Sequence, residues 1–208
     1  MKRPPIFQVG LTGGIGCGKS AVRRMVSELG FPTIDVDTVA KNIAVEDAEA
    51  IAAIKKTFGE EVYDKNGGLQ RKVLAAKVFG DRAELAKLNK IVHPRVFVHV
   101  NRLLAPFVEQ GRKIAVIEAA LFYESGWDHN MDKMAVVTAP MEKRLAWAQA
   151  RDNSSEAEIR ARMAHQIPVE EKAKRADYVI ENDGSLEELR EKVSAFMTWV
   201  QEQIRSSE

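Results

Sequence analysis

The stretch that decides the fold reads Gly13-Gly14-Ile15-Gly16-Cys17-Gly18-Lys19-Ser20 and fits the pattern G-x-x-x-x-G-K-[ST]. Glycines let the backbone wrap closely enough for successive N–H groups to point at phosphate oxygens. In such a loop the lysine reaches the β- and γ-phosphates, and the hydroxyl of the last residue binds magnesium. An apolar run precedes the stretch and a helical pattern follows it. The sequence therefore predicts an ATP and Mg²⁺ site formed by Gly13–Ser20 together with Ala21.

Short apolar runs rich in valine or isoleucine recur along the chain, separated by segments of helical pattern. This alternation is typical of a parallel sheet that is buried on both faces. The expected strands are Ile6–Leu11, Pro32–Ile34, Ile114–Ile117, Met134–Thr138 and Tyr178–Ile180. We therefore expect an α/β protein of the P-loop NTPase fold, with a five-stranded parallel sheet flanked by helices.

The first and last helices have clear sequence signals. Apolar residues from Val22 to Leu29 lie at helical spacing, and Gly30 suits the end of that helix. Ser185 and Glu188 form a capping-box pair ahead of a long apolar stripe. The stripe consists of Leu186, Leu189, Val193, Phe196, Val200 and Ile204. It is too short to favour a coiled coil, so a helix packed on the sheet is the preferred interpretation.

Two helical segments interrupt the strand pattern. Residues 37–111 are broken only at a polar turn, 64–68, and are longer than a crossover needs, so they predict a helical substrate-binding insertion. Residues 140–166 are rich in arginine and predict a helical lid over phosphates. The lid arginines are Arg144, Arg151, Arg160 and Arg162. The ranges 1–36, 112–139 and 167–208 are expected to form the nucleotide-binding core.

Acidic residues follow two of the expected strands, at the edge where a parallel sheet faces its ligand. A kinase needs a carboxylate to accept or orient the proton of its acceptor, and Asp35 and Asp37 could supply it. A second possibility, equally open, is that Asp37 caps the next helix. Glu118 ends its strand like a Walker B acid, which contacts magnesium through water. Glu124 is either catalytic or held in an ion pair, for example with a lid arginine.

Composition excludes several classes of protein. The chain has 208 residues, 45% of them hydrophobic and 29% charged, and its formal net charge of +1 draws it neither to nucleic acid nor to a membrane. Cys17 is the only cysteine, which excludes a disulfide framework, and we expect its backbone rather than its thiol to matter. No apolar stretch approaches the ~18 residues of a membrane span. We expect a soluble cytoplasmic protein, either a monomer or a weak homo-oligomer.

Several segments together resemble the dephospho-coenzyme A kinase family over nearly the whole chain. Besides the loop, they are Asp35-Val36-Asp37, Asn66–Arg71 with Leu74 and Phe79, Ile91-Val92-His93-Pro94, Glu118–Glu124, Arg151-Asp152 with Arg162-Met163 and Gln166, and Ala176–Ile180 with Asn182 and Gly184-Ser185. The ordered set is far more specific than the loop alone. The resemblance implies that ATP phosphorylates the ribose 3′-hydroxyl of dephospho-coenzyme A, the last step of coenzyme A biosynthesis. It also implies a nucleotide core, a helical substrate domain and a lid.

The resemblance also implies roles for single residues. Asp37 would be the general base, Lys19 the phosphate clamp, and Arg144 and Arg151 would neutralise charge on the moving phosphoryl group. Asn182 would meet the adenine of ATP or hold its turn. The residues expected to bind the substrate are Asp35, Asp37, His93, Glu118 and Leu121. Ser20 and, through water, Glu118 would bind the metal. His93 is otherwise interpreted as a buried histidine at a helix end.

The chain departs from the family pattern at four positions. Glu118 stands where aspartate is usual, and its longer side chain still allows a water-mediated magnesium contact. Ala120 replaces a proline, and Gln70 replaces an aspartate before an arginine. Trp147 takes a lid position where arginine is common, so the charge of the lid differs from that of the family.

Three other functions compete with this interpretation. A kinase of a nucleoside monophosphate or another small molecule would have a similar insertion and lid. A GTPase switch is disfavoured, because Asp64-x-x-Gly67 lies in a polar turn and Asn89–Val92 lacks the aspartate that reads guanine. An inactive scaffold is disfavoured by the intact Lys19, Ser20 and Asp37.

Overall fold

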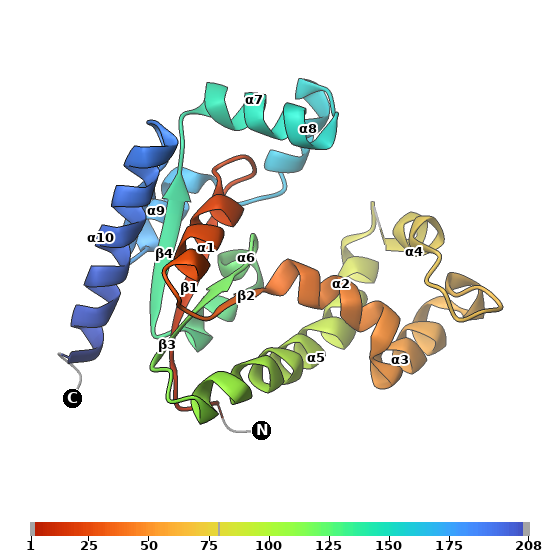
Figure 1. Ribbon diagram of the computed structural model, residues 1–208. Helices are drawn as coiled ribbons and strands as arrows, with labels where there is room; N and C mark the ends of the chain where they lie inside the picture. Colours follow the sequence, from red (N-terminus) through yellow and green to blue (C-terminus); the bar gives the residue numbers. More distant parts are fainter. Residues whose placement is uncertain (1–2, 79, 206–208) are drawn as a thin grey trace. The chain divides into compact units, whose positions relative to one another are not determined.

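The structure, a computed structural model, describes residues 3–78 and 80–205 and divides them into two compact units (Figure 1). The larger unit holds Pro5–Asp35 and the chain from Phe107 onward. The smaller unit holds Val36–Pro106 and the described residues before Pro5. Phe79, which belongs to the family resemblance, lies outside the described residues. No helix within the two described ranges is long and apolar enough to cross a membrane.

The larger unit is built on a five-stranded sheet in the order β2-β3-β1-β4-β5. The strands are β1 (Phe7–Gly13), β2 (Thr33–Asp35), β3 (Ile114–Glu118), β4 (Lys133–Thr138) and β5 (Tyr178–Glu181). All four pairings are parallel, so the predicted sheet is confirmed. All five residues of β3 and all of β1 after Phe7 are buried, as expected for strands covered on both faces. The last residues of β2 and β3 are the acids Asp35 and Glu118.

The helices of the larger unit are α1 (Lys19–Glu28), α6 (Phe122–Ser125), α7 (Met141–Asp152), α8 (Glu156–Met163), α9 (Val169–Arg175) and α10 (Leu186–Arg205), with a 3₁₀ turn at Trp127–Asn130. Helices α1, α9 and α10 pack against strands of the sheet, whereas α7 and α8 lie beyond the end of β4 (Figure 1). Gly30 follows the end of α1 at a φ of +84°, in the left-handed region that glycine adopts without strain, as the sequence predicts.

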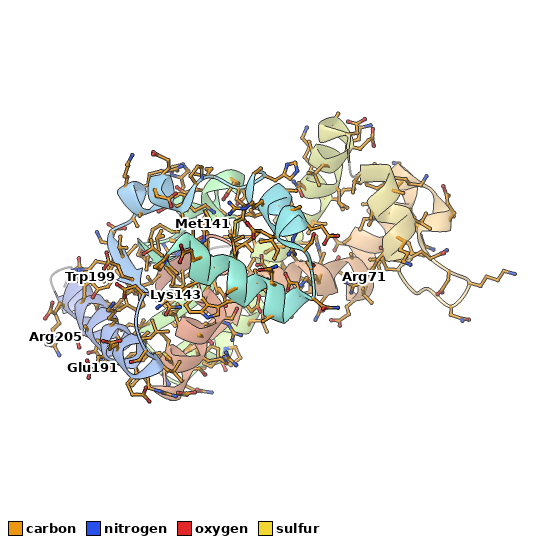
Figure 2. All side chains as sticks on the ribbon, turned by 90° about the horizontal axis from the view of Figure 1, so that it is seen from above. Arg71, Met141, Lys143, Glu191, Trp199 and Arg205 are labelled. Atoms are coloured by element: carbon orange, nitrogen blue, oxygen red, sulfur yellow. The ribbon has the colours of Figure 1, made fainter. Side chains whose placement is uncertain are left out.

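The last helix, α10, packs against α1 and β5, as the apolar stripe predicts. Its start carries the predicted capping box, in which the Glu188 amide donates to Ser185 Oγ and the Ser185 amide donates to Glu188 Oε2. The ring of Tyr178 on β5 lies 5.0 Å from that of Trp199, which is labelled in Figure 2. Leu186 departs from the prediction, because 55% of it is exposed and it lies outside the buried stripe.

The smaller unit is helical, as the long helical pattern predicts. It contains α2 (Val36–Glu46), α3 (Ala48–Phe58), a 3₁₀ turn (Glu60–Val62), α4 (Arg71–Val78) and the greater part of α5 (Arg82–Glu109). The unit has its own apolar core, formed by Ala44, Ile54, Phe58, Val62, Tyr63, Leu74 and Val78. The polar turn is present where expected, and Asp64 Oδ1 accepts hydrogen bonds from the amides of Asn66 and Gly68.

A buried carboxylate ties α3 to α5 within the smaller unit. Asp47, only 5% exposed, caps α3 by accepting from the Ala50 amide at 2.9 Å. Its Oδ2 also accepts from Arg95 at 2.6 Å and lies 2.8 Å from His99 Nε2. Burial alone would raise the pKa of Asp47, but the hydrogen bonds from Arg95, Ala50 and His99 outweigh it and hold the pKa well below its usual range.

Replacing Asp47 with asparagine should lower the free energy of unfolding at pH 7 by about 2 kcal/mol, because a charged hydrogen-bonded pair is lost while a cap remains. The folded pKa lies below the unfolded value of about 4, so the carboxylate stabilises above that pH and loses its effect as the pH falls. The difference from wild type in urea unfolding should therefore shrink at pH 3. Glu49→Gln, which removes an exposed partner of the same Arg95, is the control and should change little. An equal difference at both pH values would contradict this origin.

Candidate active site

The glycine-rich loop connects β1 to α1 inside the larger unit. Gly16 has a φ of +76°, and a Cβ there would collide with the backbone carbonyl of Arg144. Gly18 has a φ of +89° and caps the start of α1, and a Cβ there would collide with the side-chain amide of Asn182. These glycines are therefore required by the close approach of two later segments as well as by backbone conformation.

Helix α1 begins with the two residues at the end of the loop for which the sequence predicts a function. Lys19 is the first residue of the helix, and its Nζ donates to the carbonyl of Gly14 at 3.2 Å, back across the loop. Ser20 Oγ donates to Glu118 Oε1 at 3.2 Å. The structure thus brings the hydroxyl and the carboxylate that the sequence assigns to magnesium to within hydrogen-bonding distance of each other.

Charge is concentrated around Glu118. Burial raises the pKa of Glu118, and the nearby Arg23 and Lys19 offset only part of that effect. Arg23 Nε donates to Glu118 Oε2 at 2.7 Å, and Arg23 Nη2 lies 4.0 Å from Asp35 Oδ2. Sequence reasoning missed Arg23. The sequence feature that could have identified it is its position one helical turn after Ser20, which places it on the same side of α1 as the strand-end acids.

Three side chains from later in the chain support the loop. Arg144 Nε donates to the Ile15 carbonyl at 3.1 Å, and the Ile15 amide donates to Gln166 Oε1 at 3.2 Å. Asn182 Nδ2 donates to the Cys17 carbonyl at 3.0 Å. Asn182 thus supports the glycine-rich loop, a contact that the sequence did not predict, and its contact with adenine stays a prediction.

Cys17 is fully buried within the loop. Burial raises the pKa of its thiol, although the charges of Arg144 and Lys19 act in the other direction. A raised pKa keeps the group a neutral thiol, which is a poor nucleophile. This agrees with the expectation that only the backbone of Cys17 serves the loop.

A pocket of about 410 Å³ opens beside the loop and the start of α1. Its lining comes from the loop and α1 (Gly16, Gly18, Lys19, Ser20, Ala21, Arg24), from α7 (Trp147, Arg151) and from the chain around the start of α10 (Asn182, Gly184, Ser185, Leu186, Leu189). Trp147 is 40% exposed at this wall. The pocket thus combines the backbone of the glycine-rich loop with apolar and aromatic surface, which suits a nucleotide.

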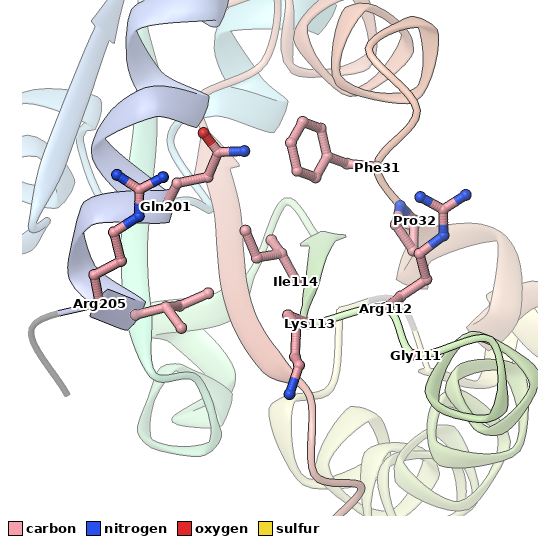
Figure 3. Close-up of a pocket in the computed structure, with 9 residues that line it drawn as sticks. Phe31, Pro32, Gly111, Arg112, Lys113, Ile114, Gln201 and Arg205 are labelled. Carbon is pink, nitrogen blue, oxygen red and sulfur yellow. The ribbon is translucent and has the colours of Figure 1, made fainter. Parts of the chain in front are cut away.

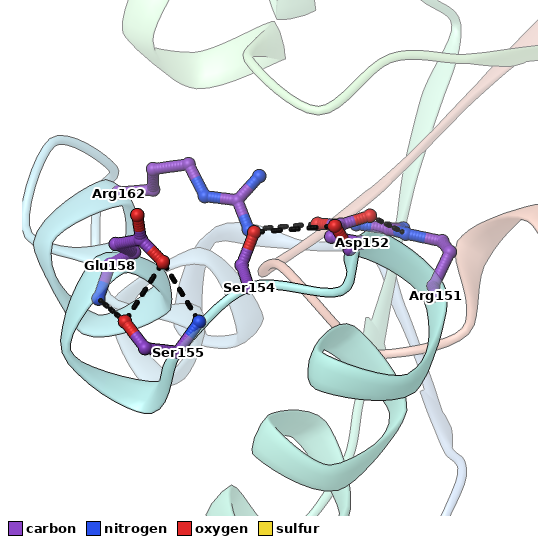
Figure 4. Close-up of polar contacts among 6 residues, drawn as sticks. All are labelled: Arg151, Asp152, Ser154, Ser155, Glu158 and Arg162. Atoms are coloured by element: carbon purple, nitrogen blue, oxygen red, sulfur yellow. Dashed lines mark hydrogen bonds and ion pairs between the residues drawn. The ribbon is translucent and has the colours of Figure 1, made fainter.

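The two arginines expected to act on phosphate lie differently on α7. Arg144 is buried against the loop, whereas Arg151 is mostly exposed and pairs with Asp152 at 2.6 Å. Asp152 also accepts from Arg162 of α8 at 2.7 Å, beside the capping box of Ser155 (Figure 4). Hydrogen bonds from Arg151 and Arg162 hold the pKa of Asp152 well below its usual range. This ionised carboxylate thus links the two helices of the predicted lid.

Glu124 has a different partner from the one expected. It pairs with Lys172 of α9 at 2.7 Å rather than with a lid arginine, so that example in the sequence analysis was wrong. The nearby Leu121 is exposed, as a ligand-contacting residue would be.

The remaining predicted site residues belong to the smaller unit. Helix α2 begins at Val36, so Asp37 is its second residue and does not occupy the capping position that the sequence left open. His93 is exposed and lies in the interior of α5, whose bounds include the following Pro94, so the interpretation as a buried histidine at a helix end was wrong. Partial desolvation of the ring lowers the pKa of His93, which favours a neutral ring.

A second pocket, of about 340 Å³, lies where β3 begins (Figure 3). It is lined by Phe31, Pro32, Gly111, Arg112, Lys113, Ile114, Gln201, Ile204 and Arg205. Because the strands are parallel, this is the edge opposite the glycine-rich loop, whereas ligands of open parallel sheets bind at the carboxyl edge. We therefore do not assign the nucleotide to it.

Comparisons with known proteins agree with the geometry. Residues 7–188 match a family model described as dephospho-CoA kinase. Dephospho-CoA kinases of Salinibacter ruber and Chlorobaculum tepidum are both 42% identical to this chain, over 92% and 89% of its length and 96% and 90% of their own. A crystal structure from Thermus thermophilus is 35% identical with a TM-score of 0.78, over 95% of this chain and 98% of that one. Dephospho-CoA kinase from Campylobacter jejuni is 28% identical with a TM-score of 0.69, over 94% and 98%.

Proposed function

This chain belongs to the dephospho-CoA kinase family, and we propose that it transfers the γ-phosphoryl group of ATP to the ribose 3′-hydroxyl of dephospho-coenzyme A. The products would be coenzyme A and ADP, in the last step of coenzyme A biosynthesis. The observation that carries the proposal is the complete phosphate loop, with Ser20 bonded to Glu118 at the carboxyl edge of the sheet. Family membership then indicates the acceptor.

The donor set fits Mg²⁺, which prefers oxygen ligands and retains several waters. Ser20 would bind it directly and Glu118 through water, and the ion supplies charge neutralisation on the β- and γ-phosphates when bound. Among the residues that the structure describes, no group of three histidine, cysteine or acidic side chains could hold a metal. The proposed ion would therefore depend on Ser20, water and the phosphates of ATP rather than on a protein cage.

The protein's own part in phosphoryl transfer is positioning and electrostatics. Lys19 would bind the β- and γ-phosphates, giving up its bond to the Gly14 carbonyl. Arg144 is packed so closely against Gly14 of the loop that a Cβ on this glycine would collide with its guanidinium. This closeness supports a role of Arg144 at the phosphates. Arg151 would reach them from the pocket wall. Asp37 would accept the proton of the ribose hydroxyl, with Asp35 beside the metal.

Residues 37–111, of which all but the last five belong to the helical unit, are the proposed substrate domain, and residues 140–166 are the proposed lid. The separate apolar core of the first segment supports its treatment as a module, and the link from Asp152 to Arg162 supports joint movement of α7 and α8. His93 and Leu121 would contact dephospho-coenzyme A. A cytoplasmic location and a monomeric or weakly associated state stay predictions.

A substrate panel tests the function. Dephospho-coenzyme A should be phosphorylated with a kcat/KM about 100-fold or more above that of any nucleoside monophosphate, because a site built for one acceptor discriminates by its polar contacts. ADP release gives the rates, and mass spectrometry with a 3′-nucleotidase identifies the phosphorylated position. Equal or better use of a nucleoside monophosphate would replace the proposal with the small-molecule kinase alternative.

A further inference from the structure

Lys172 of α9 is a fully buried lysine that the proposed chemistry does not use, with 0% of it exposed. Removing an ammonium group from water is strongly unfavourable unless its charge and its N–H groups find partners. Lys172 Nζ has two partners, Glu124 Oε1 at 2.7 Å and the carbonyl of Ala120 at 2.9 Å. Both lie in the segment that follows Glu118.

The bond to Ala120 leads toward the start of the phosphate loop. The Ala120 carbonyl also accepts from Thr12 Oγ1 at 3.3 Å, and Thr12 directly precedes Gly13. The neighbouring Ala119 amide donates to the Leu11 carbonyl at 3.1 Å. The chain after Glu118 is therefore fixed against the end of β1, with Lys172 behind it.

The bond to Glu124 leads to the middle of the loop. The Oε1 atom that meets Lys172 also accepts from the Ile167 amide at 2.9 Å. The preceding residue, Gln166, accepts the Ile15 amide of the loop at 3.2 Å. One series of contacts thus connects Lys172 to Thr12, and the other connects it to Ile15. Together the two series hold the first part of the loop from both ends.

We propose that Lys172 is a positioning residue that sets the geometry of the phosphate loop through Ala120 and Glu124. Because it is fully buried it cannot touch a nucleotide, so it acts only through these partners. The inference deepens the proposed function, on which it rests for the reaction but not for nucleotide binding. A lysine that served stability alone would leave the affinity of the folded protein for nucleotide unchanged.

The decisive variant is the double substitution Lys172→Met with Glu124→Gln. Neutral groups of similar size often replace a buried ion pair without loss of stability, and glutamine can still accept from Ile167. Methionine cannot donate to Ala120, so the link to Thr12 is lost. By calorimetry, the folded variant should bind ADP about 10-fold more weakly than wild type, the size of effect seen when coupling residues are changed. The KM for ATP should rise, and the KM for dephospho-coenzyme A should stay unchanged.

The matched control is Lys174→Met with Glu171→Gln, which removes an exposed ion pair from the same helix. It should bind ADP like wild type. Wild-type ADP affinity in the folded Lys172 double variant would overturn the proposal. If that variant does not fold, Thr12→Val alone decides, because it keeps the buried ion pair and removes only the bond between Thr12 and the Ala120 carbonyl: ADP binding should weaken about threefold, and wild-type affinity would overturn the proposal. ADP binding needs no acceptor, so this result is separate from any failure with dephospho-coenzyme A.

Discussion

Replacing Asp37 with asparagine should lower kcat about 100-fold or more, as expected when a general base is lost. Asparagine keeps the size of the side chain and its hydrogen bonding but cannot take the proton of the ribose hydroxyl. ATP affinity should stay near wild type, because Asp37 belongs to α2 and the proposed phosphate contacts come from the loop, α1 and α7. Steady-state turnover at saturating substrates and calorimetry with ATP measure the two quantities.

The neighbouring Asp35 and the distant Asp64 make the test specific. Asp35 ends β2, lies 4.0 Å from Arg23 and is proposed to lie beside the metal. Asp35→Asn should therefore mainly change the Mg²⁺ concentration needed for activity. Asp64→Asn in the polar turn keeps an acceptor for two backbone amides and should leave turnover unchanged. Wild-type turnover of the Asp37 variant would remove it from the role, and a larger loss in the Asp35 variant would move the base there.

The parts of the site that the sequence could predict are those that depend on local pattern. The phosphate loop needs consecutive residue types, and the sheet needs short apolar runs, so both were predictable without tertiary information. Strand ends also placed Asp35 and Glu118 at one edge, since parallel strands share their carboxyl edge. The contact between Glu118 and Ser20 follows from these local facts together.

The parts that could not be predicted depend on which segments meet. Lys172 lies in a short polar helix with charged neighbours, and nothing local marks it as buried. The partner of Glu124 could not be predicted for the same reason. The sequence predicts His93 at a helix end because proline usually breaks helices, yet α5 continues through Pro94. In each case packing between elements overrides a preference read from a few neighbouring residues.

Replacing Lys19 with alanine should reduce kcat/KM for ATP about 1,000-fold, because the loss of one preorganised donor to a developing charge has effects of that order. Lys19 begins α1 and already lies across the loop, bonded to the Gly14 carbonyl at 3.2 Å. The same ammonium group would meet the β- and γ-phosphates, whose charge is redistributed during transfer. Both the binding of ATP and the stabilisation of the transition state should therefore be weakened, so KM rises as kcat falls.

Nucleotides of different length separate this effect from a general disturbance of the loop. AMP lacks the β- and γ-phosphates, so the Lys19 variant should bind AMP like wild type while ADP and ATP bind more weakly. Calorimetry with the three nucleotides and single-turnover rates measure these effects. An equal loss for AMP would mean that the loop itself has collapsed, and unchanged ATP binding and turnover would contradict the role of Lys19. The expected gradient along the phosphate chain is what a clamp on the β- and γ-phosphates requires, since such a clamp would contact only those groups.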